Sequence, residues 1–384
     1  MLPDLFLAYY ADPFSLDDPI FAVKQNGVDT PRFVSASELQ DTQGRIFTFQ
    51  AARLIDALRL RSLPFIELID VRHALQLASG MSKKNYEASS WAFSKWLKLT
   101  RLLPSERERY LALIDGEIVR PEENVLAPLL LDVCVAMEDV WRGISEELGQ
   151  LGELIRFTTV EIPLQHLLHK RQWLGLAVDT NRSERFLQVA KNEKYSSMLK
   201  VGTQLNVNPT GLTYKTILPY LENTDAHGLQ KLSETKGLAS YFKITADHSG
   251  VARGFRSMLQ ANRNIKALLS LAVSDGRAYP TFDTMGTVTA RVQLSHPYLQ
   301  QLKRAYRGAL TPDSGMHASY LDYAQFEPGI LAQFVGPGRF RELYNSGDVY
   351  TALSKAVFGD DHKRTVAKQI FIAFCYGMEL SSIG

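Results

Sequence analysis

The chain has 384 residues, of which 45% are hydrophobic and 22% are charged, and its formal net charge is +2. This length allows two or three domains, and the composition is that of an ordinary soluble globular protein rather than a disordered or fibrous one. No apolar run approaches the ~20 residues of a membrane span, and the N-terminus lacks a secretory signal, so we expect no membrane partner. Cys134 and Cys375 are far apart in sequence, give no metal-site spacing and fit a reducing compartment.

The charge is unevenly distributed along the chain. Residues 1–160 contain 17 Lys and Arg against 23 Asp and Glu, whereas residues 161–384 contain 26 against 18. A basic C-terminal half fits a polyanion that binds there. The same mild asymmetry also occurs in proteins that bind no nucleic acid.

Residues 1–100 have the pattern of a small α/β unit. Short apolar runs separated by Asp-Pro, Asn-Gly and Thr-Pro turns predict strands, and the last of them leads into a helix through Ala57. Residues 66–77 repeat the strand-then-helix pattern. The four strands are expected at residues 5–10, 20–23, 32–34 and 46–49.

The next segments are helical in pattern. Trp91, Trp96 and the pair Lys83 and Lys84 are residue types that contact nucleic acid, but we favour a partly buried aromatic helix here. Residues 129–154 have apolar side chains at helical spacing and acidic residues on the other side, which predicts an amphipathic helix.

The stretch from Tyr320 to Phe334 reads YLDYAQFEPGILAQF. Asp322 follows a short apolar and aromatic run, and Glu327 lies inside an otherwise apolar segment. Ionised carboxylates are costly among apolar neighbours unless something pairs with them. One interpretation is a strand end followed by a helix that has Asp322 as its N-cap; the other is a functional site.

The stretch from His362 to Met378 reads HKRTVAKQIFIAFCYGM. Arg364, Lys368 and Tyr376 follow four-residue steps along one side of a predicted helix. Two cations on a strongly apolar helix suggest a bound anion, for which a triphosphate is one candidate. The alternative is a core helix with two cations that snorkel to solvent.

Together these two stretches resemble the nucleotide-binding motifs of family A DNA polymerases, the bacterial DNA polymerase I type. Residues 322–327, DYAQFE, are similar to that family's motif A, Asp-Tyr-Ser-Gln-Ile-Glu. Arg364-x3-Lys368 followed by Tyr376-Gly377 is similar to its motif B, the nucleotide-binding helix of the fingers.

The resemblance continues upstream in the same order. Residues 161–164, 175–179 and 205–210 are similar to segments that open and build the family's thumb. Residues 276–291 match, without a gap, a palm segment that grips the primer terminus and the duplex minor groove, and residues 296–300 continue it. The resemblance implies DNA contacts by Thr289, Arg291, Gln300 and Arg307, where isolated residues of these types would be ordinary surface side chains.

The order of elements in residues 1–100 resembles the 3′–5′ proofreading exonuclease domain that precedes this family's polymerase domain. That chemistry needs clustered carboxylates to hold two metal ions. The matching positions here are Tyr9, Tyr10 and Gln50, and Asp70 alone cannot hold two metals. We therefore expect an inactive exonuclease remnant that serves as a scaffold.

The resemblance thus implies an α/β, multi-domain α+β fold. A degenerate RNase H-like exonuclease domain is followed by the thumb, a partial palm and partial fingers of a right-hand polymerase. The expected boundaries are 1–110 for the exonuclease-like domain, 111–270 for the helical connector and thumb, 271–345 for the palm with motif A, and 346–384 for the start of the fingers.

The implied activity is template-directed DNA synthesis, in which dNTPs are added to a primer 3′ end by phosphoryl transfer with two Mg²⁺ ions, or Mn²⁺ as the alternative. Asp322 and the Tyr323 carbonyl would bind metal. Arg364 and Lys368 would hold the phosphates, with Lys368 also acting as general acid. Glu327, Gln325, Tyr350, Ile372 and Tyr376 would complete the dNTP site.

Three positions depart from the family pattern. Ile372 replaces an aromatic residue of motif B, Tyr350 replaces a histidine, and Pro328-Gly329 replaces Leu-Arg after the motif A glutamate. Sugar selection and phosphate contacts are the functions that these departures affect.

The family's second catalytic carboxylate, in a His-Asp-Glu turn downstream of motif B, has no counterpart in the sequence. We expect either a truncated polymerase or a split one, completed by a second polypeptide that carries the rest of the fingers and palm. The alternative is a non-catalytic DNA-binding or regulatory protein built on a polymerase remnant. The expected partners are primer–template DNA and dNTPs, in the cytoplasm of a bacterial or phage-infected cell.

Overall fold

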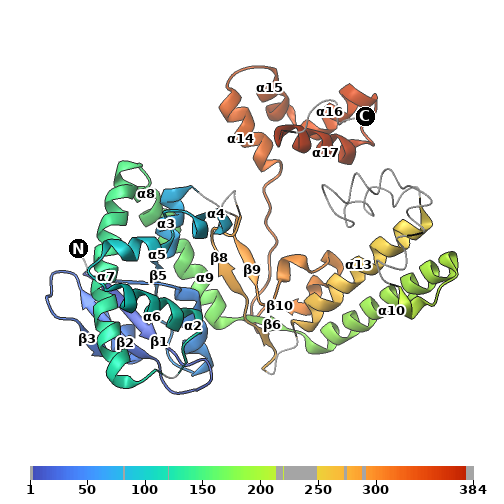
Figure 1. The fold of residues 1–384 in the computed structure, drawn as a ribbon. Helices are drawn as coiled ribbons and strands as arrows, with labels where there is room; N and C mark the ends of the chain where they lie inside the picture. Colours follow the sequence, from blue (N-terminus) through green and yellow to red (C-terminus); the bar gives the residue numbers. More distant parts are fainter. Residues whose placement is uncertain are drawn as a thin grey trace. The chain divides into compact units, whose positions relative to one another are not determined.

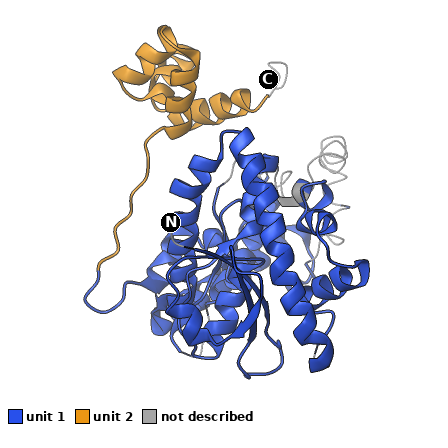
Figure 2. Cartoon of the chain, turned by 90° about the vertical axis from the view of Figure 1, so that its left-hand side faces the viewer, with its two compact units in different colours: residues 1–316 blue, residues 317–384 orange. Residues whose placement is uncertain are grey.

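The computed structural model describes residues 3–80, 83–119, 121–212, 219, 249–271, 275–287 and 291–377. The chain forms two compact units, residues 1–316 and residues 317–384 (Figure 2). No helix in these described ranges is long and apolar enough to cross a membrane.

A five-stranded sheet forms the centre of the N-terminal part of the first unit (Figure 1). Its strand order is β3-β2-β1-β4-β5, in which β1, β2 and β3 are antiparallel neighbours and β4 and β5 run parallel to β1. The four predicted strands are confirmed, and a fifth opens the strand-then-helix repeat. The strands are β1 (Asp4–Tyr10), β2 (Ile20–Gln25), β3 (Arg32–Val34), β4 (Arg45–Thr48) and β5 (Ile69–Asp70).

The side chains of β1 alternate between two hydrophobic cores, as the pleat of a strand requires. Phe6 and Ala8 belong to a core that includes α7, whereas Leu5, Leu7 and Tyr9 belong to a core that includes α2. Both faces of the sheet are therefore covered by helices. The helices of this part are α1 (Ala36–Gln40), α2 (Ala51–Leu60), α3 (Val71–Ser79), α4 (Lys83–Ala88), α5 (Phe93–Trp96), α6 (Pro104–Asp115), α7 (Glu123–Gln150), α8 (Leu154–Arg156) and α9 (Ile162–Leu174).

The predicted amphipathic helix at residues 129–154 is confirmed as α7, which begins earlier than expected, at Glu123. Trp91 and Trp96 stack with a centroid distance of 5.8 Å and pack, partly buried, against the core that includes α7. Trp96 thus lies in a partly buried aromatic helix, α5, as expected, whereas Trp91 lies in the turn before that helix. The side chains of Lys83 and Lys84 lie outside the described part of the structure.

Asp70 joins the starts of two helices at one end of the sheet. One carboxylate oxygen accepts a hydrogen bond from the Arg72 backbone N–H, which makes Asp70 the N-cap of α3, and the other accepts from the Ala51 N–H at the start of α2. The Tyr9 hydroxyl donates to the Gln50 carbonyl 3.0 Å away. The carboxylate therefore satisfies backbone donors that helix starts leave open.

Beyond α9 the described residues of the first unit form a helical pair and two small sheets. Helices α10 and α13 pack side by side along their length (Figure 1). Three strands pair in the order β10-β6-β7, and β8 and β9 form an antiparallel pair. The elements are β6 (Leu176–Val178), α10 (Thr180–Leu205), α13 (Gly250–Leu269), β7 (Arg277–Ala278), β8 (Thr281–Asp283), β9 (Gln293–Ser295), a 3₁₀ helix (Arg304–Ala309) and β10 (Leu310–Thr311).

The second unit is helical in its described part. It begins with an extended segment, residues 317–323, which has no regular secondary structure. Four helices follow: α14 (Phe326–Val335), α15 (Arg339–Ser346), α16 (Val349–Phe358) and α17 (Arg364–Cys375). The predicted helix over the motif B stretch is thus confirmed as α17.

The buried His169 of α9 makes the stability of the first unit depend on pH. Its Nδ1 lies 3.2 Å from the Leu68 carbonyl oxygen, and burial, assisted by the neighbouring His73, lowers its pKa to about 4. In the unfolded chain a histidine has a pKa of ~6.5, so acid protonates the unfolded state first. The stability that the neutral His169 contributes is therefore fully present above about pH 6.5 and is lost as the pH falls toward 4.

We expect His169→Gln to reduce the loss of unfolding free energy between about pH 7.5 and about pH 5 by about 2 kcal/mol. Urea unfolding followed by tryptophan fluorescence measures this, because all four tryptophans lie between residues 91 and 173. The exposed His317, replaced in the same way, is the control. An identical pH dependence in His169→Gln and the native chain would contradict the expectation.

Candidate active site and nucleic-acid interface

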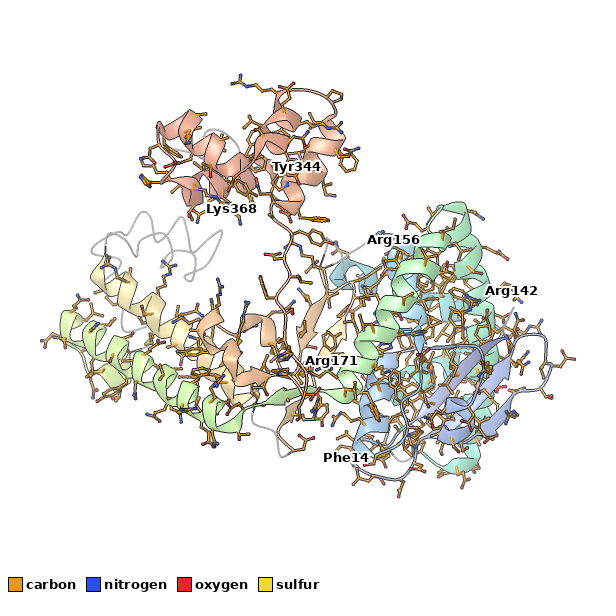
Figure 3. The ribbon with its side chains drawn as sticks, turned by 180° about the vertical axis from the view of Figure 1, so that it is seen from behind. Phe14, Arg142, Arg156, Arg171, Tyr344 and Lys368 are labelled. Atoms are coloured by element: carbon orange, nitrogen blue, oxygen red, sulfur yellow. The ribbon has the colours of Figure 1, made fainter. Side chains whose placement is uncertain are left out.

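Two cations of α17 face the same aromatic ring. The Arg364 guanidinium carbon lies 5.4 Å, and the Lys368 Nζ 5.5 Å, from the centroid of the Tyr350 ring. Both distances fall within the range of a cation–π interaction. The four-residue spacing thus places both cations on one side of the helix, as predicted. Lys368 is labelled on the second unit in Figure 3.

Asp348 fixes the first of these cations. One of its carboxylate oxygens accepts from the backbone N–H groups of Tyr350 and Thr351, which caps α16, and the other accepts from the Arg364 Nε at 2.5 Å. Burial raises the pKa of Asp348, but the hydrogen bonds from Arg364, Thr351 and Tyr350 outweigh it and hold the pKa below its ordinary value. The ionised carboxylate therefore ties the start of α17 to the start of α16.

Tyr350 is the buried centre of this cluster. Only 4% of its surface is exposed, and the Phe371 ring meets it edge-on at 5.8 Å. Burial, and then the negative charge of Glu327, raise the pKa of the Tyr350 hydroxyl. Glu327 lies in the first turn of α14. Helices α16 and α17 thus meet in one polar cluster at Tyr350.

Gln325, rather than Asp322, precedes the helix of motif A. It is the N-cap of α14 with a left-handed φ of 53°, and its Oε1 accepts from the Val349 backbone N–H at 2.8 Å. The interpretation of Asp322 as an N-cap is therefore wrong, because the helix starts at Phe326, too far along the chain. The Gln325 side chain braces the start of α16, next to the Asp348 cap.

Asp322 and Tyr323 lie in the extended segment before α14. Both are exposed, Tyr323 by 81%, and the Tyr323 ring lies 5.4 Å from that of Phe326. The strand expected before Asp322 is not formed, because a strand needs a neighbour for its backbone groups and no described strand pairs with residues 317–323.

The oxygen atoms of Asp322 and Tyr323 are suitable ligands for a hard cation such as Mg²⁺, but they provide only part of a coordination shell. Mg²⁺ is held in phosphate-transferring sites by one or two carboxylates together with substrate phosphates and water. Asp322 and the neighbouring Tyr323 carbonyl provide one carboxylate and one carbonyl oxygen. Within the described ranges no group of three or more His, Cys, Asp or Glu side chains gathers that could hold a metal by itself.

The two remaining positions of motif B lie further along α17. Ile372 is half-buried, and Tyr376, the C-cap residue, is 66% exposed.

The departure at Pro328-Gly329 has a packing reason in α14. Proline is tolerated in a first helical turn, and a Cβ on Gly329 would come within 2.5 Å of the Tyr344 hydroxyl of α15. The pair therefore lets α15 pack closely on α14.

The predicted DNA contacts lie in the first unit, around β9. Arg291 and Arg307 are exposed. The Gln300 amide is used within the protein, since its Nε2 donates to the Val292 carbonyl and its Oε1 accepts from the Leu294 N–H. Gln300 thus holds the backbone that leads from Arg291 into β9. Thr289 lies outside the described residues.

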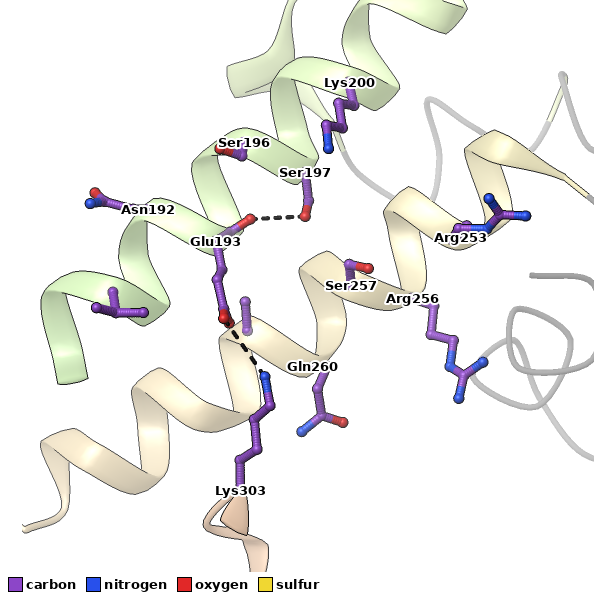
Figure 4. Close-up of a pocket in the computed structure, with 12 residues that line it drawn as sticks. Asn192, Glu193, Ser196, Ser197, Lys200, Arg253, Arg256, Ser257, Gln260 and Lys303 are labelled. Carbon is purple, nitrogen blue, oxygen red and sulfur yellow. Dashed lines mark hydrogen bonds and ion pairs between the residues drawn. The ribbon is translucent and has the colours of Figure 1, made fainter. Parts of the chain in front are cut away.

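A cleft of about 720 Å³ lies between α10 and α13 (Figure 4). The residues that line it include Lys200 of α10, Arg253 and Arg256 of α13, and Lys303 of the segment after β9. Glu193 accepts a hydrogen bond from Tyr306 and forms an ion pair with Lys303 at 3.7 Å. Cations outnumber the single acid, so the cleft is a basic surface.

These cleft residues lie outside the motifs predicted from the sequence, although the sequence contains a signal for them. Arg253, Arg256 and Arg263 recur at helical spacing, and the buried side chains of α13 lie between them. A basic stripe opposite an apolar face is the pattern of a helix that meets a polyanion.

The comparisons with known proteins agree with the motifs. The model of DNA polymerase family A matches residues 185–383, which is more than half of the chain. The chain belongs to DNA polymerase family A. It is 27% identical over 255 residues to DNA polymerase I of Helicobacter pylori, an alignment that covers 62% of this chain and 27% of that protein. It is 22% identical over 325 residues to DNA polymerase I of Aquifex aeolicus, covering 78% of this chain and 52% of that protein.

The fold also has a solved counterpart. A structure described as the POL domain of Pol1 from M. smegmatis in complex with DNA primer-template and dNTP aligns with a TM-score of 0.66 at 18% identity. The alignment covers 98% of this chain and 68% of that one, and it establishes the likeness of the fold. The family A chain spans between about a quarter and a half of the length of the two curated relatives above.

We expect Asp348→Ala to destabilise the second unit by about 1–2 kcal/mol, because it removes the α16 cap and leaves Arg364 without its carboxylate. Amide hydrogen exchange of α16 measures this locally. Glu342→Ala, an exposed acid in the first turn of α15, is the control. Equal exchange in the two variants would show that the Asp348 contacts do not hold α16.

Proposed function

We propose that this family A chain forms the primer–template grip and the dNTP site of a template-directed DNA polymerase. The observation that carries the proposal is the convergence of Arg364 and Lys368 on the buried Tyr350 ring. A nucleoside triphosphate offers a polyanion for the two cations and a sugar for the ring.

In the proposed site, Arg364 and Lys368 hold the triphosphate by charge-assisted hydrogen bonds. Asp348 keeps Arg364 in place, so its donors are already oriented when the nucleotide arrives. Lys368 donates a proton to the leaving pyrophosphate. Glu327 limits the space beside the sugar and so discriminates against a 2′-hydroxyl, and Tyr376 closes the pocket against the sugar and base.

The metal chemistry is proposed to require partners outside residues 1–384. Two Mg²⁺ ions, when bound, activate the primer 3′ oxygen and stabilise the leaving pyrophosphate. Asp322 and the Tyr323 carbonyl provide ligands for them, which suffices only together with substrate phosphates and a second carboxylate. That carboxylate is proposed to come from the family's motif C, in further sequence or in a second polypeptide.

The primer–template duplex is proposed to lie along the first unit. Lys200, Arg253 and Arg256 would contact its phosphates in the cleft between α10 and α13, since a duplex carries a dense row of negative charge. Arg291 and Arg307, with Thr289, would meet the duplex near the primer end, where Arg reads minor-groove acceptors.

The N-terminal sheet is proposed to be an exonuclease-like scaffold without exonuclease activity. Its strand order, three antiparallel strands followed by two parallel ones, supports the likeness. The Asp70 carboxylate is occupied by backbone N–H groups, and Tyr9 and Gln50 offer no acid beside it. We extend this domain beyond residue 110, because its core continues to Ile162. We propose that the thumb follows and ends at residue 270, that the palm comprises residues 271–345, and that the fingers begin at residue 346.

Binding of a fluorescent dATP analogue, with Mg²⁺ and primer–template present, tests the nucleotide site. Lys368→Ala and Arg364→Ala should each weaken binding by about tenfold, the loss of one charge-assisted hydrogen bond. Lys355→Ala, which removes an exposed lysine of α16 paired with Asp361, is the matched control. Tight binding in all three variants would refute the site. If the chain binds primer–template but binds no nucleotide, the result would support the non-catalytic alternative.

The exonuclease proposal has its own test. We expect no Mg²⁺-dependent release of nucleotides from a mismatched 3′ end, because a single capping aspartate cannot assemble a two-metal site. Release is measured on denaturing gels with a 5′-labelled primer. Release that disappears in Asp70→Asn would place an active exonuclease in this domain and contradict the scaffold role.

A further inference from the structure

The segment that leads into β8 and β9 is held at two points by the N-terminal domain. Residues 275–287 contain β7 and β8, and β9 follows. The first point of contact is Tyr279, directly after β7. The second is Thr284, directly after β8. Both points belong to the first unit.

At the first point, Tyr279 is enclosed by three groups. The Arg59 guanidinium, at the end of α2, lies 3.8 Å from the centroid of its ring. Its hydroxyl donates to the Asp275 carboxylate. A Cβ on Gly175 would come within 2.6 Å of the ring, so only glycine allows this approach between α9 and β6. The guanidinium–ring contact therefore joins the N-terminal domain to the end of β7.

At the second point, a buried hydrogen bond joins α3 to the end of β8. His73 Nδ1 lies 3.2 Å from Thr284 Oγ1, and the two residues are only 2% and 4% exposed. Burial lowers the pKa of His73, against the opposing charges of Asp70 and Asp283 and a hydrogen bond with Gln165. The ring is therefore neutral near pH 7, and losing its partner would leave a buried polar nitrogen without a hydrogen bond.

The pairing of β8 with β9 connects these two contacts to the predicted DNA-binding residue Arg291. β8 and β9 are antiparallel, with Thr281 opposite Ser295 and Asp283 opposite Gln293. Arg291 lies two residues before Gln293, the start of β9, and Gln300 braces the backbone between them. A shift of β8 would therefore move Arg291.

We propose that the N-terminal domain is the positioning element of the β8–β9 pair, through Arg59 on Tyr279 and His73 on Thr284. This inference rests on the proposed function for its consequence: a fixed pair holds Arg291 at the place where the primer end lies. Positioning matters because a displacement of about 1 Å at a binding group is enough to cost much of its effect. Arg59, His73, Tyr279 and Thr284 are positioning residues, since none of them is proposed to touch DNA.

The test uses the full chain and a matched pair of threonine variants. Thr284→Val removes the hydroxyl that meets His73. Thr48→Val removes an equally buried hydroxyl, which donates to the Leu7 carbonyl inside the N-terminal sheet. Both variants lose one buried hydrogen bond, so a general loss of stability affects both. Arg59→Ala, with the exposed and ion-paired Arg32→Ala as its control, keeps the test open if Thr284→Val does not fold.

Two readouts separate the inference from the proposed function. Amide hydrogen exchange of β8 and β9 should rise about tenfold in Thr284→Val and Arg59→Ala and stay unchanged in the two controls. The Kd for a labelled primer–template, from fluorescence anisotropy, should rise about tenfold in the same two variants only.

Equal exchange in Thr284→Val and Thr48→Val would overturn the inference. So would a rise in exchange with an unchanged Kd, because the contacts would then be structural alone. If the native chain binds no primer–template, the proposed function fails, and the exchange data still decide whether the N-terminal domain holds the β8–β9 pair.

Discussion

The dNTP site proposed for the second unit depends on one carboxylate, Asp348. It caps α16 with one oxygen and holds Arg364 with the other, so a single ionised group fixes two helices that meet at Tyr350. Without it the cation at the start of α17 would be free to extend into solvent, as long basic side chains do. Gln325 adds a second brace at the start of α16. The cluster is thus organised before any nucleotide binds.

The N-terminal domain shows the same use of a carboxylate for structure. Asp70 is buried, yet its two oxygens receive backbone N–H groups from the starts of two helices, and the Arg72 guanidinium lies 3.9 Å away, so its charge is compensated within the protein. A buried carboxylate is costly unless it is hydrogen-bonded. The two helices whose starts Asp70 joins, α2 and α3, also contact the segment around β7 and β8, through Arg59 on Tyr279 and His73 on Thr284.

Local patterns predicted most of the elements. The strands of the N-terminal sheet were predictable from apolar runs between turn residues, and α7 and α17 from helical periodicity. The four-residue spacing of Arg364 and Lys368 was enough to place them on one side of a helix, because that relation depends only on helix geometry. The capping role of Asp322 was wrong because α14 begins only at Phe326, after Gln325, whose side chain accepts from the Val349 N–H of α16 and does not cap its own helix.

The sequence by itself determined the family, the order of the motifs and the helix that carries the two cations. Only the tertiary structure decided what those side chains meet: Arg364 and Lys368 on Tyr350, Gln325 on Val349, Gln300 on the β9 backbone, and His73 on Thr284. The physical reason is the range of the interactions. Periodicity and turn chemistry act between neighbours in sequence, whereas hydrogen bonds and ring contacts join residues that only folding brings together, and no local pattern encodes those partners.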